Sequence, residues 1–529
     1  MRKILKNTAI LALTAMFALP AMAQLSGTGY YRIKNAQRTS DYISLANDKF
    51  NFTTCISTAC GGLSKAYTSA GQARAMECVG KYLETDIHLV DDPDIIVPGS
   101  VIYAQKRNTN VNNHEYNLVG QGTSLLTLTA GTYDGTLDLN FYNNYITISP
   151  ASGSGASTQY TASIELKAQN ISIANLGTRY FVDNSGIFSI NTSSSAQNAK
   201  WYIEPVTHFN VQPEVELNGK YYTTLKVAFA FTLSGQVEKA YAITANNGTL
   251  QYQEITGTIP AGTPVLLQCG SPNAADCQLI PTGAPIFTAP DNATTSSAPT
   301  ADESSSYSGT NLLAGTYYCN TDGAMTFTTP SGTSSFNANH VTAATGKYVI
   351  GLNADGKLGF VPATGSNMPA NKAWLTSAGL FPTLATPTIM PAGGNYDAAQ
   401  TVTITAEEGV TIYYTTDGSE PSIASAVYTE PITVGEGNTT IKAIAVKSGL
   451  YNNSDVASAQ YVIELPVTTF KGDVNGDGKI TISDVSALID YLLGNDVNPF
   501  IEANADVDGN ETISIRDVSS LIDLLLNEQ

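Results

Sequence analysis

A short acidic segment occurs twice near the C-terminus of the chain. The first copy reads GDVNGDGKITISDVSALIDYLL over residues 472–493, and the second reads ADVDGNETISIRDVSSLIDLLL over residues 505–526. The copies lie 33 residues apart and agree at 13 of 24 aligned positions, which identifies an internal repeat. Carboxylates packed this closely repel one another unless a cation lies between them. The repeat therefore favours a C-terminal fold that can hold cations.

The first copy has the spacing of a calcium loop. Its oxygen-bearing side chains occupy loop positions 1, 3, 5 and 12, which are Asp473, Asn475, Asp477 and Asp484. Gly478 stands at position 6, where the backbone must turn in the left-handed region. Lys479 at position 7 offers its main-chain carbonyl, and Thr481 at position 9 acts through water. Hard oxygen ligands on a flexible loop favour Ca²⁺ over Mg²⁺ or a transition metal. The alternative is a solvated, aspartate-rich turn without metal.

A helix is predicted after this loop and none before it. The preceding TTFKG is too short and too polar for an entering helix, whereas one apolar stripe follows the loop. The stripe consists of Val485, Leu488, Ile489, Leu492 and Leu493. A duplicated loop with only its exiting helix, and with Asp instead of Glu at position 12, resembles the dockerin domain of cellulosome-type assemblies over residues 472–528. That resemblance implies two calcium ions and a cohesin domain as a protein partner.

The family pattern can be carried over residue by residue. It implies ligands of the first calcium at Asp473, Asn475, Asp477, Lys479 and Asp484. It implies ligands of the second at Asp506, Asp508, Asn510, Thr512 and Asp517. The partner-selecting positions 10 and 11 correspond to Ile482, Ser483, Ile515 and Arg516. Because these two pairs differ, the two faces need not bind a cohesin equally well. The second loop also has Glu511 in place of glycine at position 6, which predicts a weaker second site.

The N-terminus and the charge indicate an exported protein. Residues 1–23 have a basic start, an apolar run and a small-residue end typical of a cleaved signal peptide, and the run is too short for a membrane span. Without this segment the formal charge changes from −19 to −22. Such acidity argues against nucleic acid and anionic membranes as partners, and we expect no membrane insertion. The predicted location is extracellular or at the cell surface.

Six cysteines permit disulfides in an exported chain. Cys269 and Cys277 are the favoured pair because a short loop separates them. Cys55 can pair with Cys60 or with Cys78. A metal site is the alternative interpretation, but neither group has CxxC spacing or nearby histidines.

The rest of the chain predicts a mainly β, multidomain protein. Apolar residues alternate with Thr, Ser, Asn and Gly through most of its length, which is typical of short antiparallel strands. We expect a signal peptide at 1–23, a β-rich domain at 24–206, a second β-rich domain at 207–380, a β-sandwich at 384–464 and a small helical calcium module at 470–529.

Each β region resembles something known. The first opens with GYYRIKNAQRTSDYISLA and closes with RYFVDNSGIFSINTSSSAQNAKWYIEPV. These aromatic–x–Ile/Val strands resemble the repeats of ricin-type β-trefoils. The second contains GKYVIGLNADGKLGFVPATGSNMPANKAWL, which is similar to a module of secreted bacterial surface proteins without an established catalytic role. Residues 384–464, with IYYTTDGSEPS and TIKAIAV, resemble the chitobiase/β-hexosaminidase C-terminal (Fn3-associated) domain. That likeness implies an immunoglobulin-like sandwich with Val402, Ile404, Ile441, Ala443 and Ile444 inside.

No catalytic motif emerges from the sequence. The four histidines lack metal-ligand spacing, and neither GxSxG nor a P-loop occurs. The acidic run at Asp91, Asp92 and Asp94 is the best place for a carboxylate pair, although such a run more commonly forms a turn. We therefore name no catalytic residue and favour a non-enzymatic protein, linked to polysaccharide degradation, whose β modules bind carbohydrate or the cell surface. The alternatives are a glycoside hydrolase with its active site within 25–376, and an adhesin.

Overall fold

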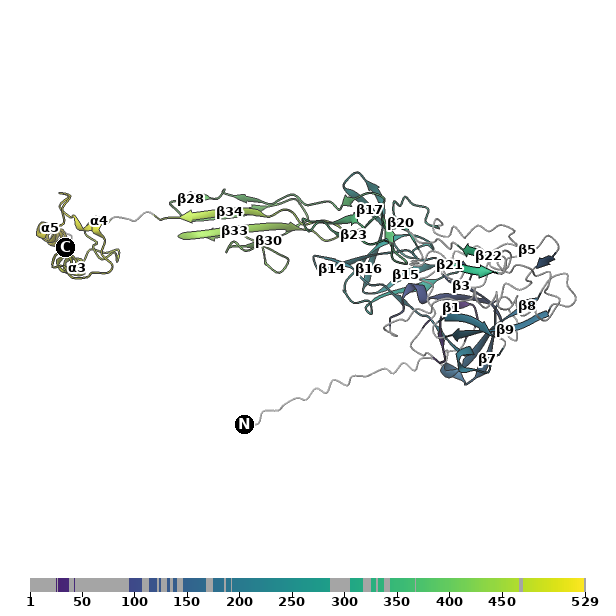
Figure 1. Ribbon diagram of the computed structural model, residues 1–529. Coiled ribbons are helices and arrows are strands. Elements are labelled where there is room, and N and C mark those ends of the chain that lie inside the picture. The colour runs from purple at the N-terminus through teal and green to yellow at the C-terminus, as the bar shows by residue number, and fades with distance from the viewer. Residues whose placement is uncertain are drawn as a thin grey trace, which may run out of the picture. The chain divides into compact units, whose positions relative to one another are not determined.

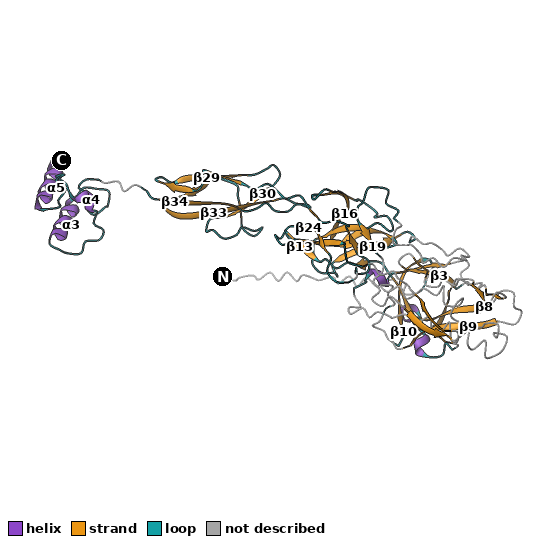
Figure 2. Ribbon diagram, turned by 45° about the horizontal axis from the view of Figure 1, so that its top comes forward, coloured by secondary structure: helices purple, strands orange, loops and turns teal. Residues whose placement is uncertain are grey.

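The computed structural model is mainly β-structure, and the α-helices that it describes lie near the C-terminus (Figures 1 and 2). It describes residues 25, 27–37, 42, 95–106, 114–120, 123–124, 131–133, 137–139, 146–167, 175–184, 187–191, 193–285, 305–316, 325–329, 332–336, 343–366, 368–465 and 470–527. Contacts group residues 1–383 with 449–452 as one compact unit, and 384–448 with 453–529 as another. None of the described helices is long and apolar enough to cross a membrane.

The first unit begins with a closed antiparallel barrel. Strand β1 pairs with β2 and β11, β3 pairs with β2 and β7, and β8 pairs with β7 and β11, which closes the ring. Its six strands are β1 (Gly29–Asn35), β2 (Ile102–Lys106), β3 (Glu115–Gly120), β7 (Ile146–Ser152), β8 (Gln159–Lys167) and β11 (Trp201–Pro205). Ile33, Ile102 and Trp201 are buried at the centre of this alternating pattern.

A two-stranded hairpin lies between barrel strands at two places in the chain. The hairpin β9 (Asn175–Asn184) and β10 (Ile187–Asn191) lies between β8 and β11, and β5 (Gly131–Tyr133) and β6 (Leu137–Leu139) lie between β3 and β7. The short strand β4 (Thr123–Ser124) pairs with β3, and the 3₁₀ turns are η2 (Pro98–Ser100), η3 (Gly155–Ser157) and η4 (Gln197–Ala199). The six-stranded barrel confirms the β-rich fold predicted for this region, whereas its likeness to a β-trefoil stays a prediction.

The second β region of this unit is built from small antiparallel sheets. The largest has the order β13 (Val215–Leu217), β14 (Lys220–Leu225), β18 (Val265–Cys269), β16 (Val237–Asn246) and β17 (Leu250–Glu254). Two others are β12 (Phe209–Asn210), β19 (Cys277–Thr282), β15 (Ala230–Gly235), and β23 (Tyr348–Leu352), β24 (Leu358–Pro362), β26 (Gly379–Leu380). The remaining pairs are β20 (Ala314–Gly315) with β25 (Ala373–Trp374), and β21 (Met325–Thr329) with β22 (Gly332–Phe336).

The barrel and the second β region share a hydrophobic core. Ile96 packs in the same buried cluster as Phe209 and Phe231. The Asn210 side chain accepts a hydrogen bond from the Ile96 N–H at 2.9 Å and donates one to the Ala274 carbonyl at 2.9 Å. Burial of these polar groups is tolerated because each has a partner. The boundary predicted at 206/207 therefore runs through a common core, which explains why residues on both sides form one compact unit.

A β-sandwich follows. One sheet has the order β27 (Thr388–Met390), β29 (Gln400–Thr405), β32 (Ile432–Val434), and the other β28 (Gly394–Tyr396), β34 (Ala457–Ile463), β33 (Gly437–Val446), β30 (Thr411–Thr415), β31 (Ala426–Val427). All five residues expected inside are buried: Val402, Ile404, Ile441, Ala443 and Ile444. The turn after β30 uses Gly418 at φ 81°, and Asp417 Oδ1 accepts from the Ser419 N–H at 2.9 Å.

The C-terminal module is helical. It consists of α3 (Ile482–Leu492), α4 (Glu502–Ala505) and α5 (Ile515–Asn527). Helices α3 and α5 pack against each other through Val485, Leu488, Val518 and Leu521, all buried. A core this small gives limited stability by itself, so other interactions must contribute.

Candidate metal centre

The first acidic loop brings three carboxylates together. Oxygen atoms of Asp473, Asp477 and Asp484 all lie within 4.8 Å of one another. The loop is bent by bonds to its own backbone: Asp473 Oδ1 accepts from the Asp477 N–H at 3.0 Å, and Asp473 Oδ2 accepts from the Gly478 N–H at 2.8 Å. Gly478 has φ 83°, the left-handed conformation expected for position 6. The turn therefore aims the side-chain oxygens at a common centre.

Asp484 connects the start of the loop to the start of helix α3. Its Oδ1 accepts from the N–H groups of Val474 at 2.9 Å and Asn475 at 3.0 Å, and its Oδ2 accepts from the Thr481 N–H at 2.9 Å. Thr481 caps α3 and forms a capping box with Asp484. The carboxylate is fully buried, and the helix N-terminus favours its negative charge. These hydrogen bonds hold the position-12 carboxylate between the start of the loop and the first turn of α3.

The second loop repeats this geometry. Oxygen atoms of Asp506, Asp508 and Asp517 lie within 4.8 Å of one another. Asp517 accepts from the N–H groups of Asp508 at 3.0 Å and Ser514 at 2.8 Å. Burial alone raises the pKa of Asp517, but these hydrogen bonds outweigh it and lower the pKa below its usual value. The two loops therefore offer matching clusters of carboxylate oxygens.

The residue at loop position 6 differs between the two loops, although the backbone is left-handed there in both. Glu511 adopts φ 66°, in the left-handed region, where glycine was expected. Its N–H still donates to Asp506 Oδ2 at 2.9 Å, so the turn itself is preserved. A residue with a Cβ in this conformation costs about 1 kcal/mol. Glu511, the residue that departs from the expected glycine, therefore occupies a strained backbone conformation.

The other expected ligands lie on the same loops. The side chains of Asn475 and Asn510 accept from the N–H groups of Asp477 at 2.9 Å and Thr512 at 2.9 Å. The Lys479 N–H donates to Asp477 Oδ1 at 2.9 Å, which holds position 7 against the loop. Each donor set consists of oxygen atoms with several carboxylates, so it fits a hard cation such as Ca²⁺.

Comparison with protein families agrees with this geometry. Residues 471–526 match the dockerin type I domain. Residues 391–458, ahead of it, match the chitobiase/beta-hexosaminidase C-terminal domain, so both predicted resemblances and their order are confirmed. No curated protein matches the chain significantly.

The dockerin exposes apolar residues along both long helices. Ile482 and Ile515, two of the expected partner-binding residues, are 70% and 69% exposed at equivalent positions. Ser483 and Arg516 follow them at the helix starts. The apolar stripe predicted after the first loop is only partly buried, because Ile489 and Leu493 are 37% and 72% exposed. Their counterparts in the second copy, Ile522 and Leu526, are 39% and 68% exposed. Sequence periodicity missed this second, outward face because helical spacing alone does not tell which side is covered.

The cysteines differ from the prediction. Cys269 and Cys277 are two separate buried thiols rather than a disulfide. Their side chains contact each other, and burial raises the pKa of both thiols. The sequence therefore predicted correctly that Cys269 and Cys277 lie next to each other, but their sulfur atoms are not bonded in this structure. Cys55, Cys60 and Cys78 lie outside the described residues, as do Asp91, Asp92 and Asp94.

Proposed function

We propose that the chain is an exported modular protein whose dockerin binds one calcium ion in each acidic loop and attaches the protein to a cohesin-type domain. The observation that carries this proposal is a pair of matched, exposed apolar stripes. One consists of Ile482 and Ile489 on α3 with Leu493 at its end, and the other of Ile515, Ile522 and Leu526 on α5. Exposed apolar side chains gathered on one module mark interaction sites. Burying each large aliphatic side chain in a partner contributes about 1.5–3 kcal/mol.

Calcium has a structural role in this proposal. Within each loop the carboxylate oxygens lie close together, so their mutual repulsion opposes folding until a divalent cation neutralises it. The ion then holds Asp473 and Asp484, or Asp506 and Asp517, and so fixes the start of the following helix. Because the stripes lie on those helices, partner binding depends on calcium. We expect the second site to be the weaker.

The partner-binding proposal is tested with the purified full-length mature protein and a recombinant type I cohesin domain as the probe. Calorimetry in millimolar Ca²⁺ is expected to detect binding, and excess chelator is expected to abolish it. Ile482→Asp and Ile515→Asp each place a charge at the most N-terminal residue of one stripe, and the double variant does so in both. We expect the double variant to lose about a hundredfold or more in affinity, since two buried aliphatic contacts become unpaired charges.

The matched control is Ile423→Asp, which changes an exposed isoleucine of the sandwich (43% exposed) and is expected to bind normally. Circular dichroism in Ca²⁺ verifies that every variant keeps its helices. Wild-type affinity in a folded double variant would refute the assignment of the face.

We further propose that the β modules bind carbohydrate without cleaving it. The trefoil-like barrel and the neighbouring match to a chitobiase/beta-hexosaminidase C-terminal domain support this. Several plant and host polysaccharides are incubated with the protein, and gel retention is assayed together with released reducing sugar. Retention without release is the expected result. Release that disappears in an Asp91→Asn/Asp92→Asn variant would favour the hydrolase, and absence of both signals would favour the adhesin.

Export is also part of the proposal. It rests on the signal-like segment at 1–23 and predicts a mature N-terminus at Gln24. N-terminal sequencing of the protein recovered from a secreting host tests it. Recovery of uncleaved chain only from inside the cell would contradict it.

A further inference from the structure

The segment that precedes the second calcium loop is bonded to the start of the first. The Ile501 N–H donates to the Val474 carbonyl at 2.8 Å, and the Gly472 N–H donates to the Asn504 carbonyl at 2.9 Å. Ile501 caps the N-terminus of α4, and Asn504 lies within that helix. The residues on either side of Asp473, the position-1 ligand of the first loop, are therefore held by the chain that leads into the second loop.

The side chain of Asn504 adds a third bond to this contact. Its Nδ2 donates to the Asp473 carbonyl at 2.7 Å, and the residue is 1% exposed. Its Oδ1 is buried and has no hydrogen-bond partner among the described residues. An amide oxygen buried in this way costs free energy, so asparagine is a poor residue for packing alone at this position. What the side chain contributes is the bond to Asp473.

The internal repeat does not account for a buried asparagine here. The residue 33 positions earlier, at the equivalent place before the first loop, is Lys471, which is exposed. Ile501 also packs against the first loop, because a Cβ on Gly476 would lie 3.2 Å from Ile501 Cγ1. Asn504 and Ile501 are thus close to the second loop in the sequence, but they contact the first loop in space.

We propose that Asn504 is a positioning residue of the first calcium site, although it lies two residues before the first ligand of the second. Its bond holds the backbone of Asp473, whose carboxylate oxygens turn into the loop and accept from the N–H groups of Asp477 and Gly478. Groups that orient a metal ligand contribute to metal affinity, because a ligand held in place loses less freedom on binding. The proposal rests on the calcium-binding function above and adds to it a residue outside the first loop.

The test measures the calcium affinity of each site alone, by calorimetry of the full-length mature protein. Asp506→Ala leaves the first site to be measured, and Asp473→Ala leaves the second. In each background Asn504→Leu keeps the branched shape of the side chain and removes both the bonding N–H and the unpaired oxygen. We expect it to weaken the first site about fivefold, as the loss of one hydrogen bond does, and to change the second by less than about twofold. A residue that only stabilises the fold would affect both sites alike.

The matched control is Asn495→Leu. It makes the same change at an exposed amide of the same module, which donates to Asp490 Oδ1 at 2.9 Å and lies outside both loops. Neither site is expected to change in this control. Circular dichroism in Ca²⁺ verifies that every variant keeps its helices.

A second measurement decides the question if Asn504→Leu does not fold. Hydrogen exchange is followed in the Asp506→Ala protein, where calcium in the first site should slow exchange of the Ile501 N–H, because its acceptor, the Val474 carbonyl, lies in that loop. Unchanged exchange at 501–504 as the first site fills would overturn the inference. So would an unchanged first site in folded Asn504→Leu, or an equal or greater loss at the second site. In each case both loops would still bind calcium, so the broader proposal would stand, whereas a parent protein that binds no calcium would overturn both.

Discussion

Replacing Glu511 with glycine should strengthen the second calcium site. Glu511 adopts φ 66°, whereas the first loop has Gly478 at φ 83° in the same place. A left-handed conformation costs a residue with a Cβ about 1 kcal/mol, and glycine adopts it freely. Because folding and calcium binding are coupled in a small metal-dependent module, the relieved strain enters the apparent affinity. A gain of about 1 kcal/mol corresponds to an affinity about fivefold higher.

Two companion variants separate strain from charge. Glu511→Gln removes the carboxylate but keeps the Cβ, so it should leave the strain in place. Gly478→Ala performs the reverse experiment in the first loop. A Cβ at Gly478 meets no atom within 4 Å, so its penalty is conformational alone and should weaken the first site by a similar factor.

The assay is calcium titration calorimetry of the mature protein in an Asp473→Ala background, which leaves the second site to be measured alone. The reverse background, Asp506→Ala, isolates the first site for Gly478→Ala. Glu511→Gly must bind more tightly than both the parent and Glu511→Gln. Equal affinities for the glycine and glutamine variants would refute the reasoning, since charge or loop remodelling would then account for any change.

Two other predictions concern folding. The segment 470–529 should be largely unfolded in chelator and helical in millimolar Ca²⁺, because metal binding supplies folding free energy; equal circular dichroism in both conditions would contradict this. In the first unit, burial alone raises the pKa of Glu238, but bonds from Lys220 and Gln268 outweigh it and lower the pKa. The resulting stability is present above the unfolded pKa of about 4.3 and is lost as the pH falls through the lower folded pKa. Glu238→Gln should therefore reduce the change in the free energy of unfolding between pH 3 and pH 7, measured by urea denaturation, by less than about 1 kcal/mol for this partly exposed pair. An unchanged pH profile would argue against it.

Local patterns were enough to predict much of the architecture. Period-two alternation indicated strands, and the positions of Val402, Ile404 and Ile441 on alternating strand faces identified part of the sandwich core. The calcium loops were readable because their ligands are spaced within twelve residues, so chain geometry alone brings Asp473 near Asp484. The left-handed turn at position 6 was predictable for the same reason.

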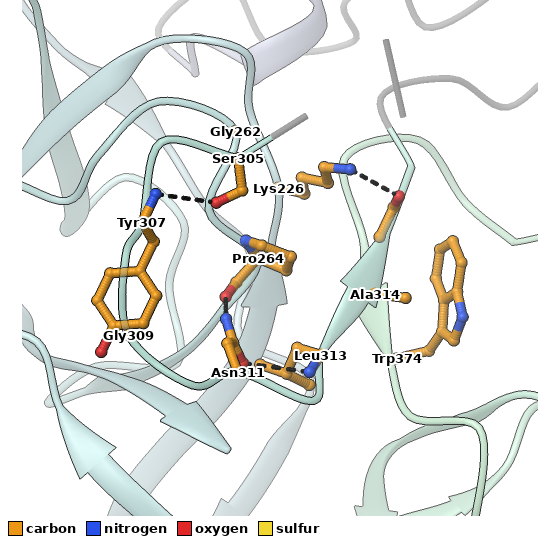
Figure 3. Close-up of a pocket in the computed structure, with 11 residues that line it drawn as sticks. Lys226, Gly262, Pro264, Ser305, Tyr307, Gly309, Asn311, Leu313, Ala314 and Trp374 are labelled. Atoms are coloured by element: carbon orange, nitrogen blue, oxygen red, sulfur yellow. Dashed lines mark hydrogen bonds between the residues drawn. The ribbon is translucent and has the colours of Figure 1, made fainter. Parts of the chain in front are cut away.

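Long-range packing was less accessible. Nothing near Asn210 in the sequence indicates that its side chain bonds to Ile96, more than a hundred residues earlier. That bond and the surrounding apolar cluster join two regions whose composition suggested separate domains. Cys269 and Cys277 were recognisable as neighbours from their spacing, yet the spacing could not determine whether their sulfur atoms are bonded. A cavity in the second β region, lined by Lys226, Asn311 and Trp374, likewise combines residues distant in the sequence (Figure 3).

The apolar residues of α3 and α5 explain why a binding face is hard to recognise from a sequence. Leu488 and Ile489 are adjacent and equally apolar, but the first is fully buried while the second is 37% exposed. Periodicity treats both as part of one hydrophobic side, because a core and a docking surface impose the same residue types on a helix. A module this small can cover only one side of each helix with its own residues. The apolar side chains that remain outside, repeated at equivalent positions in both copies, therefore point to contacts that another protein must complete.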